Sequence, residues 1–289
     1  VTYKLDGVTK TYSQYTSGFS AATTRQLIIT VAASAPTLYY WCSQHSGMGG
    51  QVNTNSTFGS TNFDGTILSR VNANPTAGFS IVTFTTNGSG SQTVGHGLGA
   101  TPSLSIRKIR DTTSDWFVHN TLLDGTMDYV KLNTNGQNSG SSLTAFSSTT
   151  IGADSNSEDY VAYVFAPIKG FSAFGSYQGT GNAEGPFVYT GFKPAWLLVK
   201  SLDATQNWQL WDLKRNSSTP VPPIGNPRVR TLSPSVNNSE TGDYEVDFYS
   251  MGFKIRNNDT AWNGDNNNYI YLTFAENPLV ASGTVSTGG

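Results

Sequence analysis

The chain has 289 residues, of which 12% are charged, and its 17 Lys and Arg against 19 Asp and Glu give a net charge of −2. This balance argues against nucleic acid as a main partner, because binding to phosphates needs a basic surface. Gly, Ser, Thr and Asn make up about two-fifths of the chain, whereas the residues that favour helices are scarce. With 12% aromatic residues to build a core, the composition predicts an all-β protein with long polar loops.

Hydropathy gives no sign of a membrane segment. The most apolar run, residues 195–199, is strand-sized and falls far short of the roughly 20 apolar residues of a membrane helix. We therefore expect no membrane insertion. The sequence has one cysteine, Cys42, so an internal disulfide framework is excluded.

The first 50 residues contain strand-like runs. Residues 27–31 are apolar and β-branched, and residues 37–42 follow after a turn that contains proline. Residues 51–77 are rich in Asn, Thr, Ser and Gly and lack apolar periodicity. This segment is predicted to be a linker or a long ordered loop.

An internal repeat begins at residue 78. The run Gly78-Phe79-Ser80 recurs at residues 170–172, an offset of 92 that also relates Trp116 to Trp208. Near the end, residues 160–166 match residues 269–275 with an offset of 109. The second copy has therefore gained 109 minus 92, or 17, residues, and the Pro-rich segment 219–227 is the candidate insertion.

Each copy, residues 78–169 and 170–280, offers the same order of strand-like segments separated by turn residues. Helical periodicity is absent between them, so the predicted architecture is an antiparallel β-sandwich or jelly roll with an internal duplication. The sequence leaves open whether the copies form two sandwiches or two halves of one. Residues 281–289 are predicted to form a C-terminal tail.

Several separated motifs resemble a known family. Residues 77–82 (AGFSIV) and 93–99 (TVGHGLG), then 185–192 (GPFVYTGF) and 273–278 (TFAENP), resemble repeat domains of tail-fibre and related virion proteins of marine phages, including cyanophages. The resemblance covers about residues 36–280. It implies a structural or receptor-binding protein on the virion surface, with no catalytic residues.

A second resemblance is local and lies in residues 40–48 (YWCSQHSGM). The C-x2-H-x2-M spacing is similar to the copper loop of cupredoxins, which implies Cys42, His45 and Met48 as metal ligands. Cupredoxins take a second histidine from an upstream strand, and none precedes Cys42, so residues 1–50 resemble an incomplete cupredoxin-like segment. The alternative is a vestigial loop without a cofactor, in which Cys42 is a small buried residue.

Two tryptophans are candidate ligand contacts. Trp262 lies in the Asn-rich loop 257–268, and Trp211 takes the place in the second copy that His119 has in the first. Loop aromatics among Asn and Asp side chains suit a sugar-binding surface, because ring stacking combines with fixed hydrogen bonds.

The resemblance to tail-fibre repeats implies a phage virion surface protein, and we expect a tail fibre that binds a glycan on the host cell surface. Tail fibres are commonly trimeric, so the resemblance implies a homotrimer, in which multiplied weak contacts gain avidity, and contacts with other virion proteins. One alternative is a purely structural role as a capsid decoration or fibre shaft. Another is a glycan-degrading spike, although no paired carboxylates at a defined spacing emerge and we do not expect an enzyme.

Overall fold

The computed structural model describes residues 1–29, 38–41, 49–52, 59–215, 226–227, 230–242 and 245–278. The chain divides into two compact units, Val1–Ser60 and Thr61–Gly289. Antiparallel strands dominate both units, which confirms the predicted all-β fold. Within the described ranges, no helix is long and apolar enough to cross a bilayer. The expected tail, residues 281–289, lies outside the described residues.

The first unit holds a small sheet and a helix. The sheet has the order β2-β1-β3 and consists of β1 (Thr2–Leu5), β2 (Val8–Lys10) and β3 (Arg25–Ile28). Helix α1 (Tyr12–Gly18) departs from the all-strand expectation for residues 1–50. It begins at a capping box, in which the side chains of Thr11 and Gln14 each accept a hydrogen bond from the other's backbone amide. The strands β4 (Leu38–Trp41) and β5 (Gly49–Val52) form a separate antiparallel pair.

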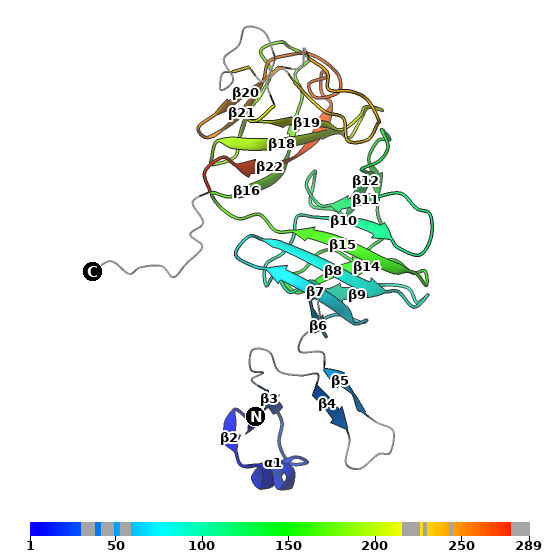
Figure 1. Cartoon of the computed structure of the whole chain (residues 1–289), viewed down its shortest axis with the longest axis vertical. Helices are drawn as coiled ribbons and strands as arrows, with labels where there is room; N and C mark the ends of the chain where they lie inside the picture. Colours follow the sequence, from blue (N-terminus) through cyan, green and yellow to red (C-terminus); the bar gives the residue numbers. More distant parts are fainter. Residues whose placement is uncertain are drawn as a thin grey trace, which may run out of the picture. The chain divides into compact units, whose positions relative to one another are not determined.

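The first copy of the repeat forms two sheets (Figure 1). Its strands are β8 (Phe79–Thr85), β9 (Gln92–Gly95), β10 (Leu104–Ile109), β11 (Phe117–Asn120), β12 (Asp128–Lys131), β13 (Ser139–Gly140), β14 (Thr150–Ala153) and β15 (Asp159–Phe165). Two earlier strands, β6 (Ser60–Asn62) and β7 (Ser69–Asn74), extend the main sheet, whose order is β13-β12-β11-β10-β15-β8-β7-β6. The strands β9 and β14 form the second sheet.

The segment 51–77, expected to be a linker or a long loop, contributes a full strand to this main sheet. β7 pairs with β8 through six residue pairs, from Ser69 with Phe84 to Asn74 with Phe79. Val71 and Ala73 pack against the core of the first copy. The expectation was wrong for β7, because β8 supplies its hydrogen-bond partners and two small apolar residues suffice to anchor it.

The second copy repeats this arrangement. Its strands are β16 (Ser172–Gln178), β17 (Phe187–Tyr189), β18 (Pro194–Ser201), β19 (Gln209–Asp212), β20 (Val246–Tyr249), β21 (Gly252–Ile255) and β22 (Asn268–Ala275). The four-stranded sheet β16-β22-β18-β19 has the same order as β8-β15-β10-β11 in the first copy, and a three-stranded sheet has the order β17-β21-β20. The predicted duplication is therefore present in the fold.

Pairing registers locate the residues that the second copy has gained. Val118 pairs with Val130 in the first copy, and Leu210 pairs with Leu232 in the second, which raises the offset from 92 to 102. Ten residues are therefore gained before Leu232, near the Pro-rich segment. The bounds of β14 and its counterpart β21 also differ by 102, whereas β15 and its counterpart β22 are offset by 109. Seven more residues are therefore gained in the loop between β21 and β22. The single insertion expected at 219–227 is thus corrected to two, and the second one carries Trp262.

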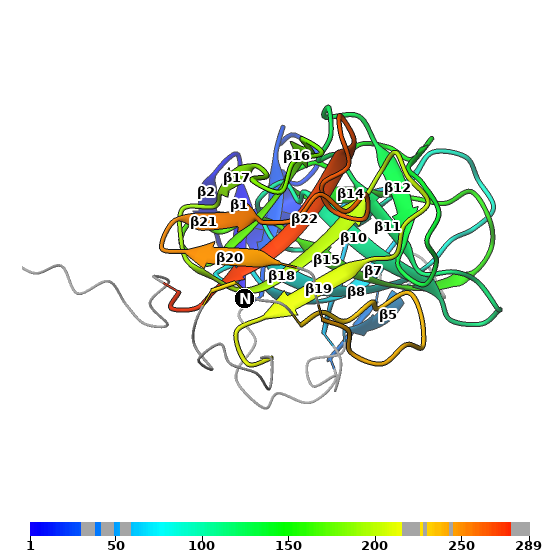
Figure 2. The same cartoon turned by 90° about the horizontal axis from the view of Figure 1, so that it is seen from above.

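Three apolar clusters hold the second unit together. One lies between the two sheets of the first copy and another between the two sheets of the second copy. The third joins the copies, because Leu104 and Val118 of the first pack with Leu198, Trp208 and Leu272 of the second. Figures 1 and 2 show the main sheets of the two copies lying face to face. Each copy is therefore a sandwich of its own, and the two sandwiches share a core.

Candidate ligand-binding surface

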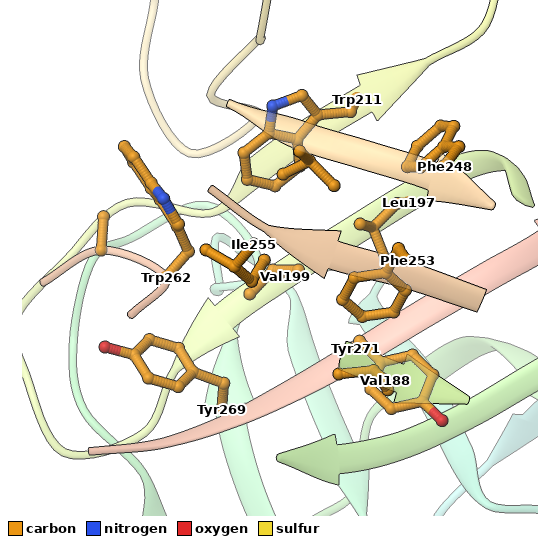
Figure 3. Packing of buried hydrophobic residues seen from close by; sticks show 12 residues of the cluster. Val188, Leu197, Val199, Trp211, Phe248, Phe253, Ile255, Trp262, Tyr269 and Tyr271 are labelled. Carbon is orange, nitrogen blue, oxygen red and sulfur yellow. The ribbon is translucent and has the colours of Figure 1, made fainter. Parts of the chain in front are cut away.

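Trp211 and Trp262 lie in the core of the second copy (Figure 3). Trp211 is 0% exposed and Trp262 is 1% exposed, and their rings meet edge to face with centroids 5.9 Å apart. Trp211 projects inward from β19, and the inserted loop places Trp262 against it. Neither ring is available to stack on a sugar, which corrects their assignment as ligand contacts. A large aromatic side chain favours burial wherever the fold offers an enclosed place.

The proposed copper ligands Cys42, His45 and Met48 lie outside the described residues. The strands on either side of them, β4 and β5, are antiparallel partners, with Trp41 opposite Gly49. Among the residues that the structure does describe, no three His, Cys, Asp or Glu side chains gather as a metal site would require. Copper binding at residues 42–48 stays a prediction.

Exposed aromatic side chains gather on the outer face of the sheet β17-β21-β20. Phe187 is 50% exposed, Tyr189 65% and Tyr249 39%, and we call these three residues the aromatic platform. Strand alternation sends Val188, which lies between the first two, into the core. Tyr189 and Tyr249 both pair with Gly252 of the central strand, so the two tyrosines flank a residue without a side chain.

Gly252 allows the platform to lie close to the sheet. A Cβ atom at this position would stand 2.9 Å from Cζ of Phe187 and 2.1 Å from the carbonyl oxygen of Val188. The Phe187 ring therefore leans across the central strand toward Tyr249, with ring centroids 6.0 Å apart and planes at 60°. The two rings in contact present a joined apolar surface.

Charged side chains border the platform. Glu184 Oε2 lies 3.0 Å from Lys254 Nζ and 2.6 Å from Arg256 Nη1, and Arg256 Nε lies 3.2 Å from Asp247 Oδ2. The hydrogen bond from Lys254 lowers the pKa of Glu184, so this carboxylate is ionised at neutral pH. The Tyr249 hydroxyl donates to Asp247 at 2.9 Å, which raises the pKa of the tyrosine and keeps it neutral.

This arrangement can bind a ring that has one apolar face and several hydroxyl groups. The aromatic platform offers stacking, and the bordering carboxylate, ammonium and guanidinium groups offer hydrogen bonds in fixed positions. The search for loop tryptophans missed it. The available signal was the run Phe187-Val188-Tyr189, in which both faces of one strand carry large aromatic or apolar side chains, but this pattern does not tell an exposed face from a buried one.

Comparison with known proteins adds a family but no activity. The model of DUF7483, described as a domain of unknown function, matches residues 8–278. No curated protein and no solved structure matches the chain. The match spans both copies of the repeat, the aromatic platform and most of the first unit. The chain therefore belongs to the DUF7483 family.

Proposed function

We propose that this protein is a phage virion surface protein, a tail fibre that binds a glycan of the host cell through the aromatic platform. The platform is the observation that carries the binding part, because exposed rings beside charged groups suit the recognition of sugars. The phage part rests on the motifs at residues 77–82, 93–99, 185–192 and 273–278 and on their resemblance to tail-fibre repeats.

The backbone beneath the platform is anchored in the core, which favours binding. Its residues alternate with side chains that are buried in the core of the second copy, such as Val188 at 8% and Phe248 at 3% exposure. The backbone that carries the rings is therefore fixed before a ligand arrives, and Phe187 and Tyr249 also contact each other, which lowers the ordering entropy that binding costs.

The substitution Tyr189→Ala tests the platform. Loss of one stacking ring is expected to weaken binding to host cells or to a matching polysaccharide by about five- to tenfold. The melting temperature is expected to stay unchanged, because the side chain is 65% exposed. Tyr39→Ala is the matched control, since Tyr39 is a 67% exposed tyrosine on β4 of the first unit.

Binding would be measured on an array of bacterial surface polysaccharides and by pull-down with whole cells. Wild-type affinity in both Tyr189→Ala and Phe187→Ala would rule out the platform as the glycan site. If the wild-type chain binds capsid or tail proteins but neither polysaccharide nor cells, the structural alternative of a capsid decoration or fibre shaft replaces receptor binding.

We further propose that the chain acts as a homotrimer, since several weak glycan contacts gain avidity together. The first unit supports self-association, because Val8, Leu27 and Ile29 are 56%, 50% and 49% exposed and all four residues of β3 are exposed. Native mass spectrometry should give about three times 31.0 kDa. A monomer at micromolar concentration would contradict this assembly.

A further inference from the structure

A pocket of about 230 Å³ opens on the first copy of the repeat and shares no residue with the aromatic platform. It lies against β10, β11 and β12, on the face of the main sheet that turns away from the second copy. Its polar and aromatic wall consists of Arg107, Phe117, His119, Tyr129, Asp154 and Tyr160. Ile109 and residues 140–143 complete the lining.

Arg107 is the charged group of this pocket and is only 1% exposed. Its Nε donates to Ser105 Oγ at 3.0 Å, whereas Nη1 approaches Asp154 Oδ2 only to 4.0 Å. In the described part of the chain, neither Nη1 nor Nη2 has a hydrogen-bond partner. Burial lowers the pKa of Arg107 to about 10, which still leaves it charged at neutral pH. A buried guanidinium with free donors is costly, and a planar anion that accepts two parallel hydrogen bonds relieves that cost.

The second copy shows that the fold does not require a charge at this place. By the register of the repeat, Val199 corresponds to Arg107 and Trp211 corresponds to His119. Val199 and Trp211 belong to a closed apolar core, which Trp262 completes from a loop that is longer in the second copy. The first copy has the arginine and the histidine instead, and an open pocket where the second copy is filled.

The neighbours of Arg107 suit hydroxyl groups and one face of a ring. His119 is 5% exposed, and burial together with the charge of Arg107 keeps its pKa well below the ordinary value, so the imidazole is neutral. Its Nδ1 also lacks a hydrogen-bond partner among the described residues. Asp154 is 36% exposed and can accept hydrogen bonds from a ligand. Phe117 and Tyr129 line the pocket beside His119, with ring centroids 6.0 and 5.8 Å from the imidazole.

We propose that this pocket binds an acidic sugar, whose carboxylate pairs with Arg107 and whose hydroxyl groups bond to His119 and Asp154. A single negative charge fits best, because Asp154 already balances part of the arginine charge and would repel a doubly charged phosphate. At about 230 Å³ the cavity is smaller than the roughly 300–1,000 Å³ of drug-sized sites, so it accommodates one sugar residue. This site is independent of the aromatic platform and does not rest on the proposed function.

Titration of the full chain, followed by two-dimensional NMR, tests the ligand class. Glucuronate is expected to shift the backbone signals of β10, β11 and β12, glucose to leave them unchanged, and acetate to bind more weakly than glucuronate. The uncharged methyl ester of glucuronate should lose binding, and this comparison needs no protein variant. Equal binding of glucose or the methyl ester would overturn the role of the carboxylate. Tighter binding of phosphate, or of acetate or benzoate, would overturn the sugar acid as the ligand.

Variants of Arg107 test whether this residue binds the carboxylate. Arg107→Met should weaken glucuronate binding by about tenfold or more, because a charged hydrogen-bond pair is lost. Arg107→Lys keeps the charge without the planar fork and should also weaken it. Arg110→Met removes an exposed charge directly after the same strand and should bind like wild type. Unchanged affinity in folded Arg107→Met would overturn the site. Loss of glucuronate binding in Tyr189→Ala would show that the acidic sugar binds to the aromatic platform and not to this pocket.

Discussion

The two copies of the repeat share a fold but differ at single residues that decide whether a pocket forms. Val199 and Trp211 close the core of the second copy, whereas Arg107 and His119 at the same register leave a polar pocket in the first. The four strands around these positions have the same order in both copies, so the difference at this place lies in side-chain chemistry and in the loop that adds Trp262. The difference is already visible when the two copies are aligned in sequence, because Arg107 aligns with Val199.

Lys200 is a buried lysine whose ionisation should make stability depend on pH. Its side chain is 0% exposed, its Nζ donates to the carbonyl of Ser201 at 2.6 Å, and burial lowers its pKa to about 8. Between pH 8 and the unfolded value of 10.5, the unfolded chain binds more protons than the folded chain, so stability rises with pH in that window. The slope from this residue is at most about 1.4 kcal/mol per pH unit.

Lys200→Met should therefore be more stable than wild type at pH 7, and its advantage should shrink as the pH rises from 8 to 10. Urea unfolding at a series of pH values measures this difference. Lys108→Met, at the repeat-equivalent and only partly buried position, controls for the loss of one positive charge. A stability difference that does not vary between pH 8 and pH 10 would contradict the assignment.

At the scale of elements, β21 sets the geometry of the platform. Its first residue, Gly252, has no space for a side chain, since a Cβ atom would meet the backbone of β17 at 2.1 Å. Gly252→Ala is expected to lower the free energy of unfolding by about 1–3 kcal/mol and to displace Phe187. The Gly90→Ala control adds a methyl group where nothing lies within 4 Å. Thermal denaturation and glycan binding measure the two effects, and equal melting temperatures for the two variants would refute the close approach.

Strands were predictable wherever one face of the segment is regularly apolar. β15 alternates between buried and partly buried residues along its whole length and β8 does so up to Phe84, and the sequence pattern predicted both strands. β7 was missed because only Val71 and Ala73 anchor it, and its hydrogen bonds come from β8. Helix α1 has no apolar periodicity to mark it, because it is seven residues long and none of them is buried, so the capping box of Thr11 and Gln14 is its local signal in the sequence.

At the scale of the whole molecule, the shared core couples the two copies. Trp208 of the second copy is 0% exposed, and its Nε1 donates to the carbonyl of Lys131 in the first copy at 2.8 Å. Trp208→Ala should lower stability by about 3–5 kcal/mol. Hydrogen exchange should quicken in β11 and β12 as well as in β18 and β22, because both copies contribute to one cluster.

The repeat-equivalent Trp116 gives the control for this prediction. It is only partly buried and stacks on Tyr163 with centroids 6.3 Å apart, so Trp116→Ala should have the smaller effect. Faster exchange confined to the second copy in Trp208→Ala would show that the two sandwiches unfold independently.

The sequence by itself determined the all-β class, the duplication and its offsets, because alternation and repetition can be recognised without knowing the tertiary contacts. Only the tertiary structure decided which aromatic residues are exposed. Trp211 and Trp262 lie in the core and Tyr189 lies on the surface, since burial depends on which strand faces are covered by another sheet. It also decided that two sandwiches share a core and that Arg107 lines a pocket. These outcomes depend on packing between residues far apart in the chain, which local sequence patterns do not encode.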